Sequence, residues 1–188
     1  MTTPSTPVAD SVRLALPSEA AVIAAIQRRR WVAELPPELS TSALAALTVE
    51  EMTEAWHAAI TRPPQARFRV LVAVEDGRVV GFATTLPSAD ADAEEGVDGA
   101  VEEFGIDPPA QRRGHGSRLL HAAVDTLRAD GFSRATSWVG TGDDVLRAFL
   151  VSAGWAPDGG HREIGPEEGQ EPDEAVRLKQ VRLHTAIG

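Results

Sequence analysis

Residues 106–120 read IDPPAQRRGHGSRLL, the end of an apolar strand that runs through a basic, glycine-bearing turn into a helix start. Gly114 and Gly116 lack a Cβ and tolerate positive φ, so the backbone there can wrap closely around an anion. Free amides at a helix start favour negative charge, and Arg112 and Arg113 add to that preference. The spacing fits neither the P-loop pattern nor the dinucleotide fingerprint. The stretch therefore predicts a phosphate-binding turn of another kind.

The composition suits one globular domain. The chain has 188 residues, 43% of them hydrophobic, and single domains commonly run to roughly 100–200 residues. We expect a flexible N-terminus at residues 1–10, which is rich in Pro, Thr and Ser, and a single domain at 11–188. The absence of cysteine excludes a thiol nucleophile, a disulfide framework and a thiolate metal site. No segment has the pattern of a signal peptide or membrane span, so we expect a cytoplasmic protein without a membrane partner.

The chain is acidic, with a net charge of −10 from 28 acidic and 18 basic residues. Because nucleic-acid binding requires a basic stripe, this balance argues against a nucleic-acid partner. An acidic surface either steers a cationic substrate or only keeps the protein soluble. Residues 87–99 carry several of the acids and little apolar content, which predicts an exposed loop, either a plain connector or a collector of cationic substrates.

The hydrophobic periodicity predicts a mixed α/β or α+β domain. Ser18 is the expected N-cap of the first helix, and Thr48 and Glu51 have capping-box spacing at the start of the second. Alternating residues on both sides of residues 75–78 predict a β-hairpin. The expected order is β-α-α-β-β-β-α-β-α-β-β, with strands at 12–16, 68–74, 79–86, 101–106, 135–139, 162–164 and 176–184, and helices from 18, from 48 to before 63, at 114–130 and at 143–153.

Three segments carry a resemblance to one family. Gln111-x-x-Gly114-x-Gly116, with Ile106-x-Pro108 before it, looks like the pyrophosphate loop of the GNAT-type N-acetyltransferases. Residues 75–83 (EDGRVVGFA) resemble their hairpin before the cofactor strand, and residues 142–155 (GDDVLRAFLVSAGW) resemble their N-x-x-A-x-x-F-Y-x-x-x-G-[FW] helix. The resemblance covers the chain from residue 11 onward. It implies the GNAT acyl-CoA N-acyltransferase fold, a mixed central sheet flanked by helices, and transfer of an acetyl group from acetyl-CoA to a primary amine.

The resemblance also implies an acetyl-CoA site. The strand ending at Ile106 would splay from the strand at 135–139 and bind the pantetheine arm through unpaired backbone groups, and the Ile106 amide would donate to the thioester carbonyl. Asp143, at the family's asparagine position, either caps its helix or reaches pantetheine. No histidine spacing indicates a metal. The loop would hold the pyrophosphate, and its expected cofactor-binding residues are Gln111, Arg112, Arg113, Gly114, His115, Gly116 and Ser117.

The sequence departs from the family at its catalytic positions. Leu150 replaces the tyrosine that usually protonates the leaving thiolate, and the chain contains no tyrosine at all. Ser152, Thr141 and His161 are candidates to protonate the thiolate instead, and because a CoA thiolate is a good leaving group, bulk water could also suffice. Ala100 stands where a carboxylate is often found. The usual acid is therefore missing, and the usual base has moved or gone.

Glu102 and Glu103 are the candidate general bases, because the attacking amine must first lose its proton. Strand alternation puts Glu102 on the face of Phe104 and Ile106, and Glu103 on the other, unless a bulge intervenes. We place Glu102 first, Glu103 second and Asp98 third. A carboxylate under a partly apolar cover would have a raised pKa, which suits a base at neutral pH.

Other features of the sequence bear on the acceptor side. The four tryptophans are best explained by core packing, although Trp31 and Trp56, on the first two helices, are candidates to line the acceptor side. The run at residues 27–30 (QRRR) is interpreted as a solvated helix end, although an anionic acceptor could use it.

Three functional hypotheses remain open. The first is an N-acetyltransferase that acts on a small-molecule or peptide amine. The second is a catalytically impaired, acyl-CoA-binding module that serves as a sensor or oligomer partner. The third is transfer of a larger acyl group, because Leu150 would make the thioester end more apolar. The resemblance also implies that dimers are common among such folds, so a homodimer is a candidate assembly.

Overall fold

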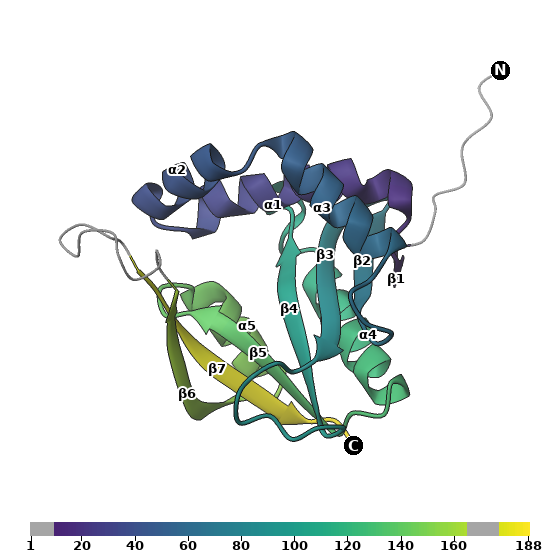
Figure 1. The fold of residues 1–188 in the computed structure, drawn as a ribbon, viewed down its shortest axis with the longest axis vertical. Coiled ribbons are helices and arrows are strands. Elements are labelled where there is room, and N and C mark those ends of the chain that lie inside the picture. The colour runs from purple at the N-terminus through teal and green to yellow at the C-terminus, as the bar shows by residue number, and fades with distance from the viewer. Residues whose placement is uncertain (1–9, 165–176) are drawn as a thin grey trace.

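The computed structural model describes residues 10–164 and 177–188 and contains a seven-stranded sheet with helices on both faces (Figure 1). The strand order is β1-β2-β3-β4-β5-β7-β6. β4 and β5 are parallel, and the other neighbouring strands are antiparallel. The strands are β1 (Ser11–Leu14), β2 (Arg69–Glu75), β3 (Arg78–Pro87), β4 (Asp98–Ile106), β5 (Arg134–Gly140), β6 (Ala156–Ile164) and β7 (Leu178–Ala186).

The helices divide into two groups on opposite faces of the sheet. Alternate residues of a strand point to opposite faces, so Val70, Val72 and Val74 of β2 pack with α1 and α3, whereas Leu71 and Ala73 pack with α4. α5 packs in the same core as α4. The helices are α1 (Ala20–Glu34), α2 (Pro37–Ala46), α3 (Val49–Thr61), α4 (His115–Ala129) and α5 (Asp144–Ser152), with short 3-10 turns at Pro17–Glu19 and Pro108–Ala110.

The parallel pair β4 and β5 separates along its length. Their pairing is confined to the start of both strands, from Asp98 opposite Arg134 to Ala100 opposite Thr136. Beyond this point the two ribbons diverge, and β5 continues with β7 and β6 as a separate half of the sheet (Figure 1). The edge of β4 that faces β5 is therefore unpaired with β5 from residue 101 onward.

Most of the predicted elements are confirmed. The hairpin turns through Asp76 and Gly77, both at positive φ, and the Thr48–Glu51 capping box is formed in both directions. Two predictions are wrong. Residues 37–46 form the additional helix α2, and Ser18 does not cap α1, because a 3-10 turn precedes that helix and Glu19 accepts a hydrogen bond from the Leu16 amide instead.

Parts of the prediction fall outside the described residues. The expected flexible N-terminus lies there except for Asp10, as does Val176, where the last strand was expected to begin. Within the ranges that the structure describes, no helix is both long enough and apolar enough to cross a membrane.

Candidate active site

A β-bulge in the middle of β4 decides where its carboxylates lie. The register with β3 shifts at this point, and Glu103 has a φ of 49°. A bulge inserts one extra residue, so Val101, Phe104 and Ile106 all reach the core beside α4. Glu102 and Glu103 both lie outside that core and are accessible to water. The bulge that the sequence analysis allowed for is present, so the simple alternation that would put Glu102 on the face of Phe104 does not apply.

Glu103 is the final acceptor in a chain of two hydrogen bonds that involves helices α1 and α3. Nε2 of Gln27, on α1, donates to the Glu103 carboxylate at 3.0 Å, and Nε1 of Trp56, on α3, donates to Oε1 of Gln27 at 2.8 Å. Water reaches Glu103, but the protein surrounding it removes part of its hydration, and this desolvation raises its pKa. The nearby Arg30 and the Gln27 hydrogen bond oppose the rise in pKa. A carboxylate with a raised pKa is suited to general-base work.

The run at residues 27–30 is not a solvated helix end. Gln27 is buried, and the three arginines that follow it all hydrogen-bond to protein groups. Trp56 is buried in the core beside α3, and Trp31 is half-buried against the same core. The partners of the arginines are the Leu47 carbonyl oxygen for Arg28, Asp107 for Arg29 and Glu34 for Arg30.

Glu102 lies in a different electrostatic environment. Desolvation also raises its pKa, and the like charges of Glu103 and Asp90 act in the same direction. Arg162 on β6 opposes this rise in pKa. The guanidinium of Arg162 lies 4.4 Å from the centre of the Trp138 ring. Glu102 therefore faces the β5–β7–β6 half of the sheet, whereas Glu103 is tied to α1.

Asp98 does not suit the role of base. It is buried, and its carboxylate accepts two hydrogen bonds from Arg134 and one from the amide of Glu94. Arg134 is the main cause of the lowered pKa of Asp98. A carboxylate that is stabilised as an anion by a buried ion pair is a poor proton acceptor.

Replacing Arg134 by methionine is expected to cost about 2 kcal/mol of unfolding free energy at neutral pH, because Asp98 would be left buried and unpaired. The cost is below that of a fully buried pair because the Arg134 side chain is 41% exposed. Since the folded-state pKa of Asp98 is lowered, its stabilisation is present above the ordinary aspartate pKa and is lost as pH falls through the folded value. Urea unfolding at neutral and acidic pH measures this, and the wild type and variant should converge at acidic pH. A loss of equal size at both pH values would contradict the assignment.

The loop between β4 and α4 has the backbone expected of an anion site. Arg112 and Gly114 have φ values of 61° and 85°, and α4 begins at His115 directly after Gly114. In the described part of the chain, no side chain caps this helix start. The amides of His115, Gly116 and Ser117 have no acceptor four residues earlier in the helix, so they are available to a ligand.

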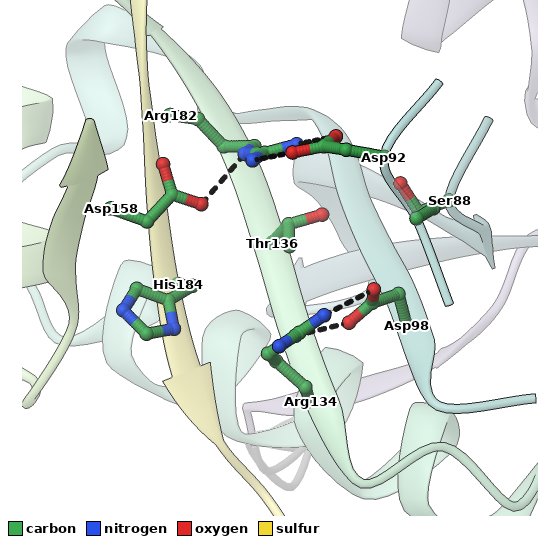
Figure 2. A pocket seen from close by; sticks show the side chains of 9 residues that line it. Ser88, Asp92, Asp98, Arg134, Thr136, Asp158, Arg182 and His184 are labelled. Atoms are coloured by element: carbon green, nitrogen blue, oxygen red, sulfur yellow. Dashed lines mark hydrogen bonds and ion pairs between the residues drawn. The ribbon is translucent and has the colours of Figure 1, made fainter. Parts of the chain in front are cut away.

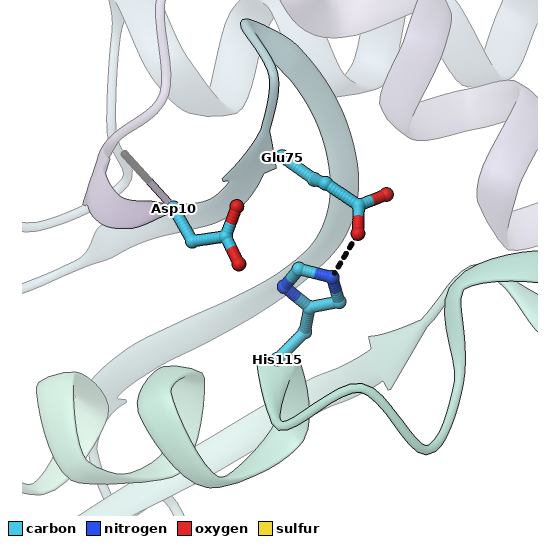
Figure 3. A group of neighbouring side chains, drawn as sticks. All are labelled: Asp10, Glu75 and His115. Atoms are coloured by element: carbon cyan, nitrogen blue, oxygen red, sulfur yellow. Dashed lines mark hydrogen bonds and ion pairs between the residues drawn. The ribbon is translucent and has the colours of Figure 1, made fainter. Parts of the chain in front are cut away.

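The side chains of this loop are joined to the β2–β3 hairpin. Arg113 donates to the Glu75 carboxylate at 2.7 Å, and His115 lies 3.1 Å from the same carboxylate. Arg118 pairs with Asp10 at 2.8 Å and lies 3.0 Å from the other ring nitrogen of His115 (Figure 3 shows Asp10, Glu75 and His115). Asp10, Glu75 and His115 are close enough to share a metal ion, but the two arginines already partner them. We interpret the group as a salt-bridge network that fixes the loop.

The end of β4 presents Ile106 to the unpaired edge. The amide of Asp107 donates to the Val80 oxygen on β3 at 2.8 Å. Because successive amides of a strand point to opposite edges, the Ile106 N–H points away from β3, toward the side where β5 diverges. Nε2 of Gln111 lies 3.4 Å from the Ile106 oxygen on the same edge. This orientation is the one that the predicted oxyanion contact requires.

α5 contributes a cap and a buried apolar position. The carboxylate of Asp143 accepts from the Leu146 amide at 2.9 Å, so Asp143 is the N-cap, and its contact with a cofactor stays a prediction. Leu150 is buried in the core, and Phe149 stacks on Phe104 with ring centres 5.9 Å apart. Leu150 therefore contributes packing where the family pattern has a phenol.

A cavity of about 220 Å³ lies between the loop at residues 88–97 and the sheet (Figure 2). Arg182 crosses it and pairs with Asp90, Asp92 and Asp158 at 2.6–3.0 Å, and Arg182 lowers the pKa of Asp92 to about 2. Trp138 also donates to Asp90. One arginine thus clamps the loop by pairing with Asp90 and Asp92, two of the acids of the predicted collector, while Glu94 and Glu95 stay exposed.

Comparison with known proteins places this geometry in a family. A family model described as the acetyltransferase (GNAT) family matches residues 29–155, which is more than half of the chain. The chain belongs to the GNAT acetyltransferase family. The match includes both carboxylates of the β4 bulge, the whole loop before α4, and α5, so the GNAT resemblance read from the sequence is confirmed.

The GNAT relatives are distant. A mycothiol acetyltransferase from Beutenbergia cavernae is 36% identical over 67 residues, a match that spans 36% of this chain and only 23% of that relative. An N-acetyltransferase structure from Staphylococcus aureus Mu50 has a TM-score of 0.70 at 17% identity and covers 96% of this chain and 100% of its own. An acetyltransferase structure from Salmonella typhimurium, described with its cofactor acetyl-CoA, has a TM-score of 0.65 at 17% identity over 96% and 95% of the two chains. At these identities, the two likenesses show a shared fold, and the family assignment rests on the family model.

Proposed function

We propose that this protein is an acetyl-CoA-dependent N-acetyltransferase that acts on a primary amine of a small molecule or peptide. The observation that carries the proposal is the edge of β4, which is unpaired with β5 beyond Ala100 and leads directly into the start of α4. A strand edge suits the amide-bearing pantetheine arm, and free amides at a helix start suit a pyrophosphate. Family membership and the similar structure described with acetyl-CoA support the same co-substrate.

Acetyl-CoA would supply the activated thioester, and residues of the chain would direct the reaction. Glu103 would accept the proton of the ammonium group, directly or through water, so that the free amine can attack. The Ile106 N–H would donate to the carbonyl oxygen as negative charge develops there. The attacking nitrogen would lose its second proton to bulk water, which would also protonate the departing thiolate, since the chain has no tyrosine. We prefer Glu103 to Glu102 because Gln27 holds its carboxylate in place.

One observation favours a second candidate function, an acyl-CoA-binding module without turnover. Leu150 occupies the tyrosine position and is buried, so no phenol can act as a general acid. Binding without turnover is therefore the alternative outcome of the test.

The test combines binding with turnover. A thermal-shift titration with acetyl-CoA, free CoA and two longer acyl-CoAs measures binding, and ligand at 100 times its Kd should stabilise the fold by about 2.7 kcal/mol. Release of free CoA thiol in the presence of an amine panel measures turnover. A shift with turnover supports the proposal, and a shift without turnover supports the binding module. A larger shift with a longer acyl-CoA would indicate that the protein transfers a larger acyl group than acetyl. The absence of a shift with every CoA species would overturn the proposal.

A further inference from the structure

We propose that Gln27 and Trp56 are positioning residues that hold the Glu103 carboxylate ready to accept the proton of the acceptor amine, and that Trp56 acts only through Gln27. This inference rests on the proposed acetyl transfer. It concerns two side chains that come from helices α1 and α3, outside the expected cofactor loop.

The hydrogen-bond types determine how Gln27 is oriented. A glutamine amide can present either its oxygen or its NH₂ group in a given direction. The indole nitrogen of Trp56 can only donate, so Oε1 of Gln27 must face Trp56, as it does at 2.8 Å. Nε2 is thereby directed at Glu103, at 3.0 Å. Trp56 thus ensures that Glu103 receives a donor, which favours the ionised carboxylate that a base requires.

The burial of these groups indicates that they are more than a packing solution. Gln27 and Trp56 are each only 8% exposed. Gln27 follows Ile23 by four residues, so it lies on the apolar side of α1. A buried amide costs free energy unless it is hydrogen-bonded, and an apolar side chain would pack there without that requirement. The Trp56 ring is fixed edge-on against Phe82, with ring centres 5.1 Å apart, so the donor has little freedom to move.

The charged groups around Glu103 define what the hydrogen bond must achieve. On α1, Arg30 is paired with Glu34, and its guanidinium lies against Gly105, where a Cβ would come within 1.8 Å of it. On β4, Glu102 is the neighbouring like charge, with Arg162 of β6 and Asp90 acting on it from the other side. β3 contributes the uncharged Thr84, and α3 contributes Trp56 itself. Among the described residues, only Arg30 and Gln27 favour the ionised form of Glu103, and they oppose the effect of desolvation.

The experiment uses Gln27→Met, Trp56→Phe, the double variant, and Trp155→Phe as a matched control. Trp155 is buried in the other core, beside α4, so its replacement reproduces the loss of a buried indole away from Glu103. The pH profile of kcat/KM is measured for each protein with acetyl-CoA and an amine found in the panel. In parallel, a carbon-13 NMR titration of the Glu103 carboxyl gives a readout that does not depend on turnover.

Gln27→Met is expected to lower kcat/KM about tenfold on the acidic limb of the pH profile, with full recovery at high pH. The reason is that the loss of one charge-assisted hydrogen bond moves this limb to higher pH. Trp56→Phe should lower kcat/KM on the acidic limb about threefold, in the same direction, since Gln27 is then free to turn its oxygen toward a protonated Glu103. The double variant should equal Gln27→Met alone, because Trp56 has no separate route to Glu103. The Glu103 titration should move with the limb, and Trp155→Phe should move neither.

Two results would overturn the inference. One is a loss of kcat/KM of equal size at every pH, which is the signature of a structural defect. The other is additive losses in the double variant, which would mean that Trp56 acts independently of Gln27. If the wild type binds acetyl-CoA but turns over no amine, the proposed function fails instead, and the NMR titration still reports whether Gln27 and Trp56 control Glu103.

Discussion

Replacing Glu103 by glutamine is expected to lower kcat/KM about 100-fold or more, with little change in affinity for acetyl-CoA. The glutamine keeps the shape of the side chain, and its oxygen can still accept from Gln27 at the 3.0 Å separation seen here. It cannot take a proton from the acceptor amine. Steady-state kinetics on the variant, together with a thermal-shift titration with acetyl-CoA, would separate the loss of base from a loss of binding.

Glu102→Gln is the matched control for this prediction. Glu102 is adjacent and also has a raised pKa, but no helix donates to it in the described structure. Its replacement removes a like charge beside Glu103, so the acidic limb of kcat/KM should move to lower pH while the maximum stays near that of the wild type. A larger loss in Glu102→Gln than in Glu103→Gln would assign the base to Glu102, the residue that the sequence places first.

The wild-type pH dependence follows from the sign of the Glu103 shift. A base must be ionised to act, and the pKa of Glu103 is raised by desolvation. kcat/KM should therefore fall as pH drops through a value above that of an ordinary glutamate, and remain high above it. A limb at or below the ordinary glutamate range would mean that another group is the base.

Local patterns in the sequence are enough to predict much of the fold. The periodicity of the strands, the capping box at Thr48 and the glycines before α4 act within a few residues, and each corresponds to an observed element. α2 was missed because residues 37–46 are mostly small and show little amphipathic pattern. Ser18 was misplaced because a 3-10 turn preceding α1 is not distinguishable from a helix start by composition.

The candidate site depended on contacts that no local pattern reveals. Gln27 and Glu103 are 76 positions apart, and the Arg182 clamp reaches back 90 positions to Asp92. The sequence does not show whether β4 contains a bulge, and the bulge decides the face on which Glu102 lies. One signal was available: a glutamine four residues after Ile23 interrupts an apolar helix face, which indicates a buried polar group with a specific partner.

Gly116→Asp is expected to weaken acetyl-CoA binding about 100-fold while leaving the fold as stable as before. Gly116 is the second residue of α4, and a Cβ there would approach nothing closer than the Phe149 ring at 3.6 Å, which is ordinary contact. A carboxylate in the first turn of a helix interacts favourably with the helix dipole, so the melting temperature should stay unchanged or rise. The same carboxylate would compete with a pyrophosphate for the free amides and repel it, and like-charge juxtaposition costs several kcal/mol.

The control for Gly116→Asp is His121→Asp, which places an aspartate at an exposed position further along the same helix. Both variants add a negative charge to α4, but only the first places it at the free amides. Isothermal titration with acetyl-CoA measures the affinity, and thermal unfolding without ligand measures the stability. Equal losses of affinity in both variants would attribute the effect to the overall charge of the helix, and full affinity in Gly116→Asp would show that the pyrophosphate binds elsewhere. Weakening confined to Gly116→Asp, in a protein at least as stable as the wild type, is the result that a phosphate-binding helix start requires, because only there do helix stability and ligand binding respond in opposite directions to one carboxylate.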